Sequence, residues 1–166
     1  MLCPFVSSAW SDVALPQLTF STDAAFSPLL PESIETGRQP TVKTAAHLMK
    51  RICYQNKGNL SAGVIVAGWD SVEGGQVYNV VMGGSCLKQR FALGGSGSLF
   101  IYGLMDSEFR EGMSEEEARS LVKKAVSHAM ARDGSSGGMV RTMTVTSEGN
   151  RRDVTAGDRL PFGPVF

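Results

Sequence analysis

The stretch DGSSGG, residues 133–138, lies between the most regular helical pattern in the chain and a segment typical of a strand. Half of its residues are glycine, which allows the backbone to turn tightly and to approach other groups closely. The others are an acid and two hydroxyl residues, which are capable of polar chemistry. A second loop of the same kind, GGSGS, occurs at residues 94–98. We expect the functional site where these two loops meet.

The helical pattern that precedes DGSSGG covers residues 114–132. Ser114 and Glu117 have the spacing of a capping box, which satisfies two backbone N–H groups at the start of a helix. The glutamates of the first turn suit the positive end of the helix dipole. One continuous apolar stripe follows at helical spacing: Ala118, Leu121, Val122, Ala125, Val126, Ala129 and Met130.

Residues 40–54 predict another helix, because apolar residues recur every three or four positions: Val42, Ala45, Ala46, Met49, Ile52 and Cys53. We place Pro40 in its first turn, where the missing N–H costs nothing. Asn56 and Gly58 are typical of a helix end. The short apolar segment 99–104 also predicts a short helix.

Three strands lie between these helices. Residues 61–69 are apolar on both faces, which favours a central strand over an edge strand. Residues 70–75 predict a hairpin connection, and residues 76–82 and 87–93 predict two further strands. Gly83-Gly84 forms the tight turn between them. Consecutive strands with short turns make an antiparallel meander.

The first 33 residues differ from the rest of the chain. They contain four prolines and no lysine or arginine, and we expect an irregular segment with at most a short strand at 18–20. After DGSSGG, residues 139–147 and 151–155 predict two more strands, which a turn joins. The order of helix, three strands, two helices and two strands predicts an α+β fold, with helices layered on a largely antiparallel sheet.

Composition excludes several classes of function. The 166 residues suit one domain, and sixteen basic residues balance sixteen acidic ones, which argues against nucleic acid or an anionic membrane as the main partner. Three widely spaced cysteines predict neither a disulfide framework nor a zinc site, and a reducing compartment fits them best. No apolar run reaches the length of a membrane span, and we find no secretory signal. We expect no metal and no cofactor.

Plainer readings of the polar residues remain open. Asp133 and Ser136 also fit a helix C-cap and turn, and Ser96 fits a simple loop. A phosphate cradle at GGSGS lacks the lysine of a P-loop. Cys53 and Cys86 fall in apolar patterns and are expected to be core thiols.

Three ordered segments carry a family resemblance: AGWDSVEGGQVYNVVMGG at 67–84, FALGGSGS at 91–98 and RDGSSGG at 132–138. In order and spacing they resemble proteasome beta subunits of the caspase-like type, which cleaves after acidic residues. The resemblance covers residues 34 to 160. It implies the four-layer αββα sandwich of N-terminal nucleophile hydrolases, assembly with other alpha and beta subunits, unfolded polypeptide substrates, and a location in cytoplasm and nucleus.

In that family an N-terminal threonine is the nucleophile, and an Asp and a Lys near the start of the domain tune it. A second set of residues surrounds the amine of that threonine. The resemblance places this second set on Ser96, Asp133 and Ser136.

Residues 1–33 carry no Thr-Thr strand, DGG turn or GxDSR segment, and no threonine there has the family's surroundings. We therefore divide the chain into an unrelated segment, 1–33, and a proteasome beta-type domain, 34–166, whose first strands and first helix are missing. The expected function is a component of the 20S core particle without its own catalytic threonine. A non-catalytic assembly subunit or an unstable splice fragment is the alternative, and a small-ligand-binding α+β domain is a more distant one.

Overall fold

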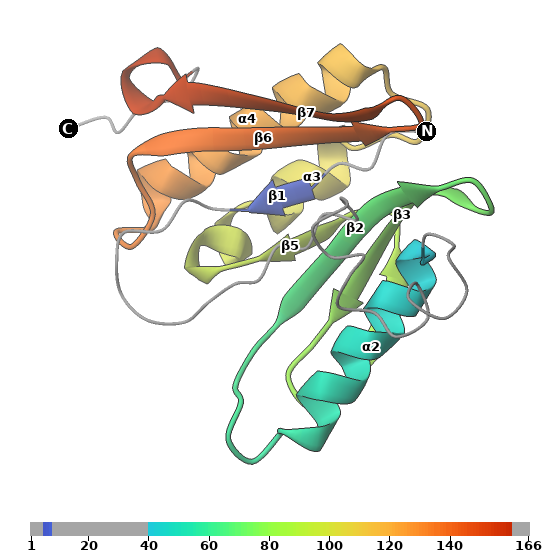
Figure 1. The fold of residues 1–166 in the computed structure, drawn as a ribbon. Coiled ribbons are helices and arrows are strands. Elements are labelled where there is room, and N and C mark those ends of the chain that lie inside the picture. The colour runs from blue at the N-terminus through green and yellow to red at the C-terminus, as the bar shows by residue number, and fades with distance from the viewer. Residues whose placement is uncertain (1–4, 8–39, 161–166) are drawn as a thin grey trace. The chain divides into compact units, whose positions relative to one another are not determined.

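The computed structural model describes residues 5–7 and 40–160 (Figure 1). The chain divides into two compact units, and each is described by itself. Among the described residues, the first unit contains 40–92 and 145–150, and the second contains 5–7, 93–144 and 151–160.

The first unit begins with helix α2, Val42–Gln55. Thr41 is its N-cap, and the Thr41 hydroxyl accepts a hydrogen bond of 3.2 Å from the backbone N–H of Thr44. Pro40 therefore precedes the cap and is not in the first turn, since the Thr41 side chain supplies the acceptor that a cap requires. The helix ends at the C-cap Asn56, as expected.

The three-stranded sheet consists of β2 (Val64–Asp70), β3 (Gly74–Val80) and β4 (Cys86–Gln89), in that order. Both pairings are antiparallel, with Val66 opposite Tyr78, so the meander is confirmed. Within the described residues β3 is central and β2 lies at the side of this sheet. The expectation of a central β2 is wrong because strand order is not encoded in a strand's own hydrophobicity.

Helix α2 packs on this sheet (Figure 1). Their facing side chains form one buried apolar cluster: Val42, Ala45, Ala46, Met49, Cys53, Val64, Val66, Tyr78 and Val80. Five of the six apolar positions that define the α2 pattern belong to it. Ile52 is the exception, with 37% of its surface exposed.

The turn between β3 and β4 needs its glycines. Gly83 and Gly84 both have φ of +89°, a left-handed conformation that favours glycine. Gly84 also lies against the last turn of α2, where an added Cβ would stand 2.8 Å from the Cβ of Tyr54. The predicted tight turn is confirmed, and it also closes the sheet onto the helix.

The strand predicted at 87–93 is two strands. The first part belongs to β4, a bend follows at Arg90, and β5 (Ala92–Gly94) pairs with β1 (Phe5–Ser7). We expected no strand at 5–7, and the short strand considered at 18–20 lies outside the described residues. The chain bends because β5 has a different pairing partner from β4.

The helices of the second unit are the 3₁₀ helix η2 (Ser96–Phe100), α3 (Tyr102–Glu108) and α4 (Glu115–Arg132). The capping box is confirmed: the backbone N–H of Glu117 donates to the Ser114 hydroxyl at 3.3 Å, and the N–H of Ser114 donates to the Glu117 carboxylate at 2.8 Å. The predicted apolar stripe of α4 is buried except for Met130.

The last strands form a hairpin of β6 (Met139–Thr146) and β7 (Gly149–Ala156), followed by the 3₁₀ turn η3 (Gly157–Arg159). Residues 139–144 and 151–159 of this segment belong to the second unit. Both strands were expected. Helices and sheets follow one another along the chain as in an α+β fold, which confirms the predicted class. No helix of the described part has the length and apolar character to span a membrane.

Candidate functional site

The two Gly/Ser loops meet, as the sequence predicts. Ser96, at the start of η2, donates a hydrogen bond of 2.6 Å from its hydroxyl to Oδ2 of Asp133, at the end of α4. Ser136 donates a hydrogen bond of 2.5 Å to the same oxygen. The three predicted site residues therefore meet at one carboxylate oxygen, Oδ2 of Asp133.

Asp133 is fixed by its backbone as well as by its side chain. Its N–H donates to the carbonyl of Ala129 at 2.8 Å, and its carbonyl accepts the N–H of Ser136 at 3.0 Å. The other carboxylate oxygen, Oδ1, accepts the N–H of Ser135 at 3.2 Å. Asp133 is thus the C-cap of α4 and the start of a turn, as the plainer reading holds, and it also reaches Ser96 on the other loop.

Gly97 allows this approach, and we did not single it out from the sequence. An added Cβ on Gly97 would lie 3.0 Å from the Cβ of Ala129, 3.2 Å from the Ser136 hydroxyl and 3.3 Å from Asp133 Oδ2. Any larger residue would push η2 away from the end of α4. The available signal was the third glycine of GGSGS, directly after the serine that bonds Asp133.

The hydrogen bonds favour the ionised form of the Asp133 carboxylate. Donation from Ser136, then from Ser96, lowers the pKa of Asp133 below that of an ordinary aspartate, against a small opposing effect of burial. Asp133 is half-buried and Ser96 is exposed, so the cluster opens to solvent. The carboxylate is therefore ionised at neutral pH and is a poor general base.

This geometry suits binding better than nucleophilic attack. Ser96 and Ser136 both direct their protons to Asp133, and each hydroxyl oxygen keeps acceptor lone pairs. A negative carboxylate flanked by two acceptors favours a cationic donor, such as a primary ammonium group. Neither serine is deprotonated by such a weak base, so the cluster can hold and orient an amine but does not activate a serine.

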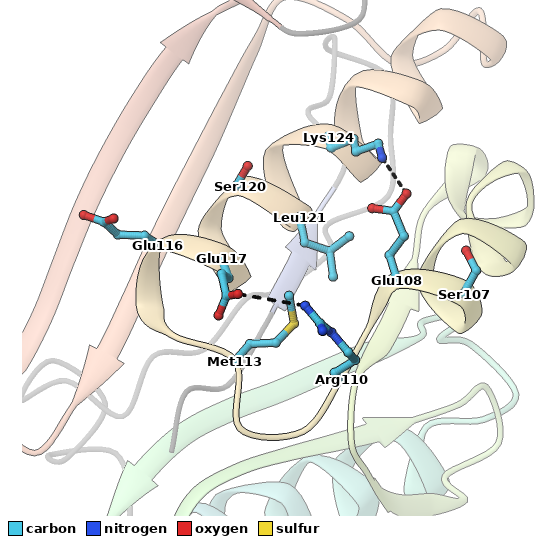
Figure 2. A pocket seen from close by; sticks show the side chains of 9 residues that line it. All are labelled: Ser107, Glu108, Arg110, Met113, Glu116, Glu117, Ser120, Leu121 and Lys124. Carbon is cyan, nitrogen blue, oxygen red and sulfur yellow. Dashed lines mark hydrogen bonds and ion pairs between the residues drawn. The ribbon is translucent and has the colours of Figure 1, made fainter.

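A separate groove lies in the same unit, between the end of α3 and the first turns of α4 (Figure 2). Its volume is about 730 Å³, and Leu121 and Met113 supply apolar side chains to it. Two ion pairs cross it: Lys124 Nζ lies 2.5 Å from Glu108 Oε1, and Arg110 Nη2 lies 3.9 Å from Glu117 Oε1. None of the residues that line it belongs to the Ser96–Asp133–Ser136 cluster.

The cysteines, which are the other candidate reactive residues, lie in apolar surroundings. Cys53 is buried and Cys86 half-buried in or against the α2 cluster, as expected of core thiols. Burial raises the pKa of both thiols, which disfavours a reactive thiolate. Across residues 5–7 and 40–160, no three metal-ligating side chains gather in one place. The threonines of residues 1–33, which lack the family's surroundings, lie outside the described residues.

Comparison with known proteins identifies the relatives of this chain. The family model for "Proteasome subunit" matches residues 24–145. This range begins inside the segment 1–33 that we set apart and ends before residue 160. Proteasome subunit beta type-6 of Arabidopsis thaliana is 48% identical over 128 residues, which are 77% of this chain and 55% of that protein.

Two further relatives extend the comparison. The probable proteasome subunit beta type-1 of Schizosaccharomyces pombe is 52% identical over 133 residues, 80% of this chain and 59% of that protein. Proteasome subunit beta type-9 of Rattus norvegicus is 46% identical over 128 residues, 77% of this chain and 58% of that protein. The chain thus spans somewhat more than half the length of the curated relatives it matches.

Proposed function

This chain belongs to the proteasome beta subunit family, and on that premise we propose that it acts as a component of the 20S proteasome core particle. Its partners in this proposal are the other alpha and beta subunits of the stacked rings. Relatives named beta type-6 and beta type-9, at 46–50% identity, support the caspase-like type, whose substrates are unfolded polypeptides cut after acidic residues.

The observation that carries the proposal is the cluster at Asp133. Ser96 and Ser136, far apart in sequence, both donate to Oδ2 of one ionised carboxylate, at 2.6 Å and 2.5 Å. Such an acceptor group fits the role that the family gives these positions, namely holding the amine of a catalytic threonine. In this proposal the three residues are positioning residues.

We further propose that these 166 residues do not hydrolyse peptides by themselves. Residues 1–33 contain none of the Thr-Thr, DGG and GxDSR patterns that carry the family's nucleophile and its lysine. The Asp133 cluster does not replace them, because its carboxylate is too weak a base to activate Ser96 or Ser136. The fold in this proposal is the αββα sandwich of the family, without its first strands and first helix, and the location is cytoplasmic and nuclear.

An unstable fragment is the second candidate, and exposed apolar side chains favour it. Leu99, Phe100 and Val72 are all more than half exposed, and exposed apolar surface promotes aggregation or binding. If the chain is such a fragment, it is degraded or aggregated when expressed. If it is a subunit, other subunits cover these residues.

Affinity purification of the tagged chain separates the two candidates. We expect the chain to co-migrate with alpha and beta subunits at the size of the core particle. Recovery of the chain only as free or aggregated polypeptide would reject the assembly proposal. The purified material should release no fluorophore from a peptide with an acidic P1 residue beyond what an Asp133→Asn control releases. A signal that is lost in this control would show that the chain has its own activity.

A further inference from the structure

The DGSSGG loop is held at both ends, by different means. At its first residue, the N–H of Asp133 bonds the last turn of α4. At its last residue, the carbonyl of Gly138 packs against Gly157, which directly follows β7. An added Cβ on Gly157 would lie only 2.6 Å from that carbonyl oxygen. The end of β7 therefore limits where Gly138 can lie.

Apolar burial does not hold β7 in place. None of its eight residues is buried, and Val154 is 58% exposed. The strand pairs with β6 in the hairpin, and ion pairs join it to α4. Lys123 Nζ lies 2.7 Å from Asp153 Oδ2, and Arg151 Nη1 lies 3.1 Å from Glu115 Oε1. The hydrogen bond from Lys123 also lowers the pKa of Asp153.

These charges are arranged in register. On α4, Glu115, Arg119 and Lys123 are spaced four residues apart and so share one face, and Glu115 also pairs with Arg119 at 3.6 Å. On β7, Arg151 and Asp153 are two residues apart and share one face of the strand. We call these five residues the charge ladder. A slip of β7 by one residue would turn Arg151 and Asp153 away from α4 and separate both pairs.

We propose that the charge ladder positions the DGSSGG loop. By fixing β7 along α4, Lys123 and Asp153 fix Gly157, and through its contact with Gly138 they fix the end of the loop that carries Ser136. The ladder acts on the geometry of the loop whether or not the chain takes part in peptide hydrolysis. Lys123 and Asp153 are therefore positioning residues for a site that neither of them touches.

Hydrogen exchange of the full chain, isolated with the subunits that accompany it, tests this proposal. In Lys123→Glu and in Asp153→Lys, we expect the amides of β7 and of residues 133–138 to exchange several-fold faster. The double variant Lys123→Glu/Asp153→Lys restores an opposite-charge pair, and we expect exchange near that of the unmodified chain. Glu73→Lys is the matched control, because it breaks the exposed Lys88–Glu73 pair of 2.6 Å in the first unit. It should leave the loop unchanged.

The proposal is overturned if the single variants speed exchange in β7 while the loop keeps its original rate. Gly157→Ala tests the same link without changing a charge, and it should speed exchange in the loop while the ladder stays intact. An unchanged loop in that variant also overturns the proposal. If the charge variants fail to fold, the unmodified chain is compared at about 0.05 M and about 0.5 M salt, since salt screens exposed pairs. Faster exchange in β7 and the loop, but not in α2, supports the ladder; an unchanged loop rejects it.

Discussion

Helix α2 and strand β7 are attached to their neighbours by opposite means. Helix α2 contributes five side chains to a buried apolar cluster with β2 and β3. Strand β7 buries no residue and reaches α4 through Lys123–Asp153 and Arg151–Glu115. Apolar burial contributes roughly 25 cal/mol per Å², whereas an ion pair at the protein surface contributes about 1 kcal/mol or less. We therefore expect the first attachment to govern stability and the second to govern local position.

The largest expected effect is at Met49, which is 4% exposed in the apolar cluster. Met49→Ala removes buried atoms and leaves a cavity, so we expect the free energy of unfolding to fall by about 2–5 kcal/mol. Ile52→Ala, on the same helix at 37% exposure, is the matched control and should cost under about 1 kcal/mol. Urea unfolding followed by circular dichroism measures both. Equal losses of stability in the two variants would contradict this prediction, because α2 would then not depend on its buried face.

The next largest effect is at the turn that closes the sheet onto α2. Gly84→Ala combines left-handed strain at φ of +89° with a contact of 2.8 Å on Tyr54, and we expect a loss of about 2–4 kcal/mol. Gly83→Ala has the same φ but meets no atom within 4 Å, so we expect only about 1–2 kcal/mol. Thermal unfolding of the pair isolates the contact from the strain. Similar losses of stability in both variants would show that the close contact of Gly84 with Tyr54 adds nothing to the backbone strain.

Asp70 provides the main polar connection between α2 and the sheet. Its carboxylate accepts the backbone N–H of Val42 at 3.0 Å, in the first turn of α2, and the side-chain amide of Gln76 at 2.6 Å. Gln76 is 2% exposed and accepts the hydroxyl of Tyr78 at 3.0 Å. Asp70→Asn removes acceptor capacity from this network, and we expect a loss of about 1–3 kcal/mol in unfolding free energy.

The pH dependence of this loss has a definite sign. Burial alone would raise the pKa of Asp70, but hydrogen bonds from Glu73, Val42, Gln76 and Val72 outweigh it and lower the pKa. A lowered pKa in the folded state gives stability that is complete above the unfolded pKa of about 3.9 and is lost as pH falls through the folded value. We expect the difference between Asp70→Asn and the unmodified chain to shrink below about pH 4. A difference that stays constant with pH would show that ionisation of Asp70 is not the cause.

Local patterns in the sequence were enough to predict the elements that depend on near neighbours. The capping box at Ser114, the apolar faces of α2 and α4, and the Gly83-Gly84 turn were all expected and are all present. The meeting of the two loops was also predicted, because chemistry-capable residues were concentrated in them. The role assigned to Ser96, Asp133 and Ser136 stays a prediction.

Features that depend on distant partners could not be predicted. The strand expected at 87–93 divides because β5 pairs with β1, more than eighty positions away in sequence. The position of β2 in its sheet depends on strand order, which a single strand does not encode. The charge ladder joins residues 30 and 36 positions apart, and charged side chains have no hydrophobic period that would reveal such pairs.

The smallest expected change in stability is at the Asp133 cluster in the second unit. Ser136→Ala and Ser96→Ala each remove one donor to Asp133 Oδ2, and we expect a cost of about 0.5–1.5 kcal/mol each. The pKa of Asp133 should rise toward an ordinary value in both variants, and more in Ser136→Ala, because Ser136 lowers it most. Carbon NMR titration of the Asp133 carboxyl measures this pKa, and Ser98→Ala, whose hydroxyl bonds the Gly95 carbonyl at 2.7 Å, is the control.

The direction of the pKa change distinguishes a binding site at Asp133 from a simple helix cap. Because the folded pKa is lowered, Asp133 adds stability above the unfolded pKa and loses it in acid; the serine variants should therefore show a weaker loss of stability on acidification. If the pKa of Asp133 does not move in either variant, the serine hydroxyls do not lower it, and the backbone N–H of Ser135 is the remaining donor that stabilises its charge. Asp133 would then be a helix cap like any other. If the pKa rises as expected, the second unit keeps a charged, hydroxyl-lined acceptor through contacts that contribute little to stability, in contrast to the buried cluster of α2.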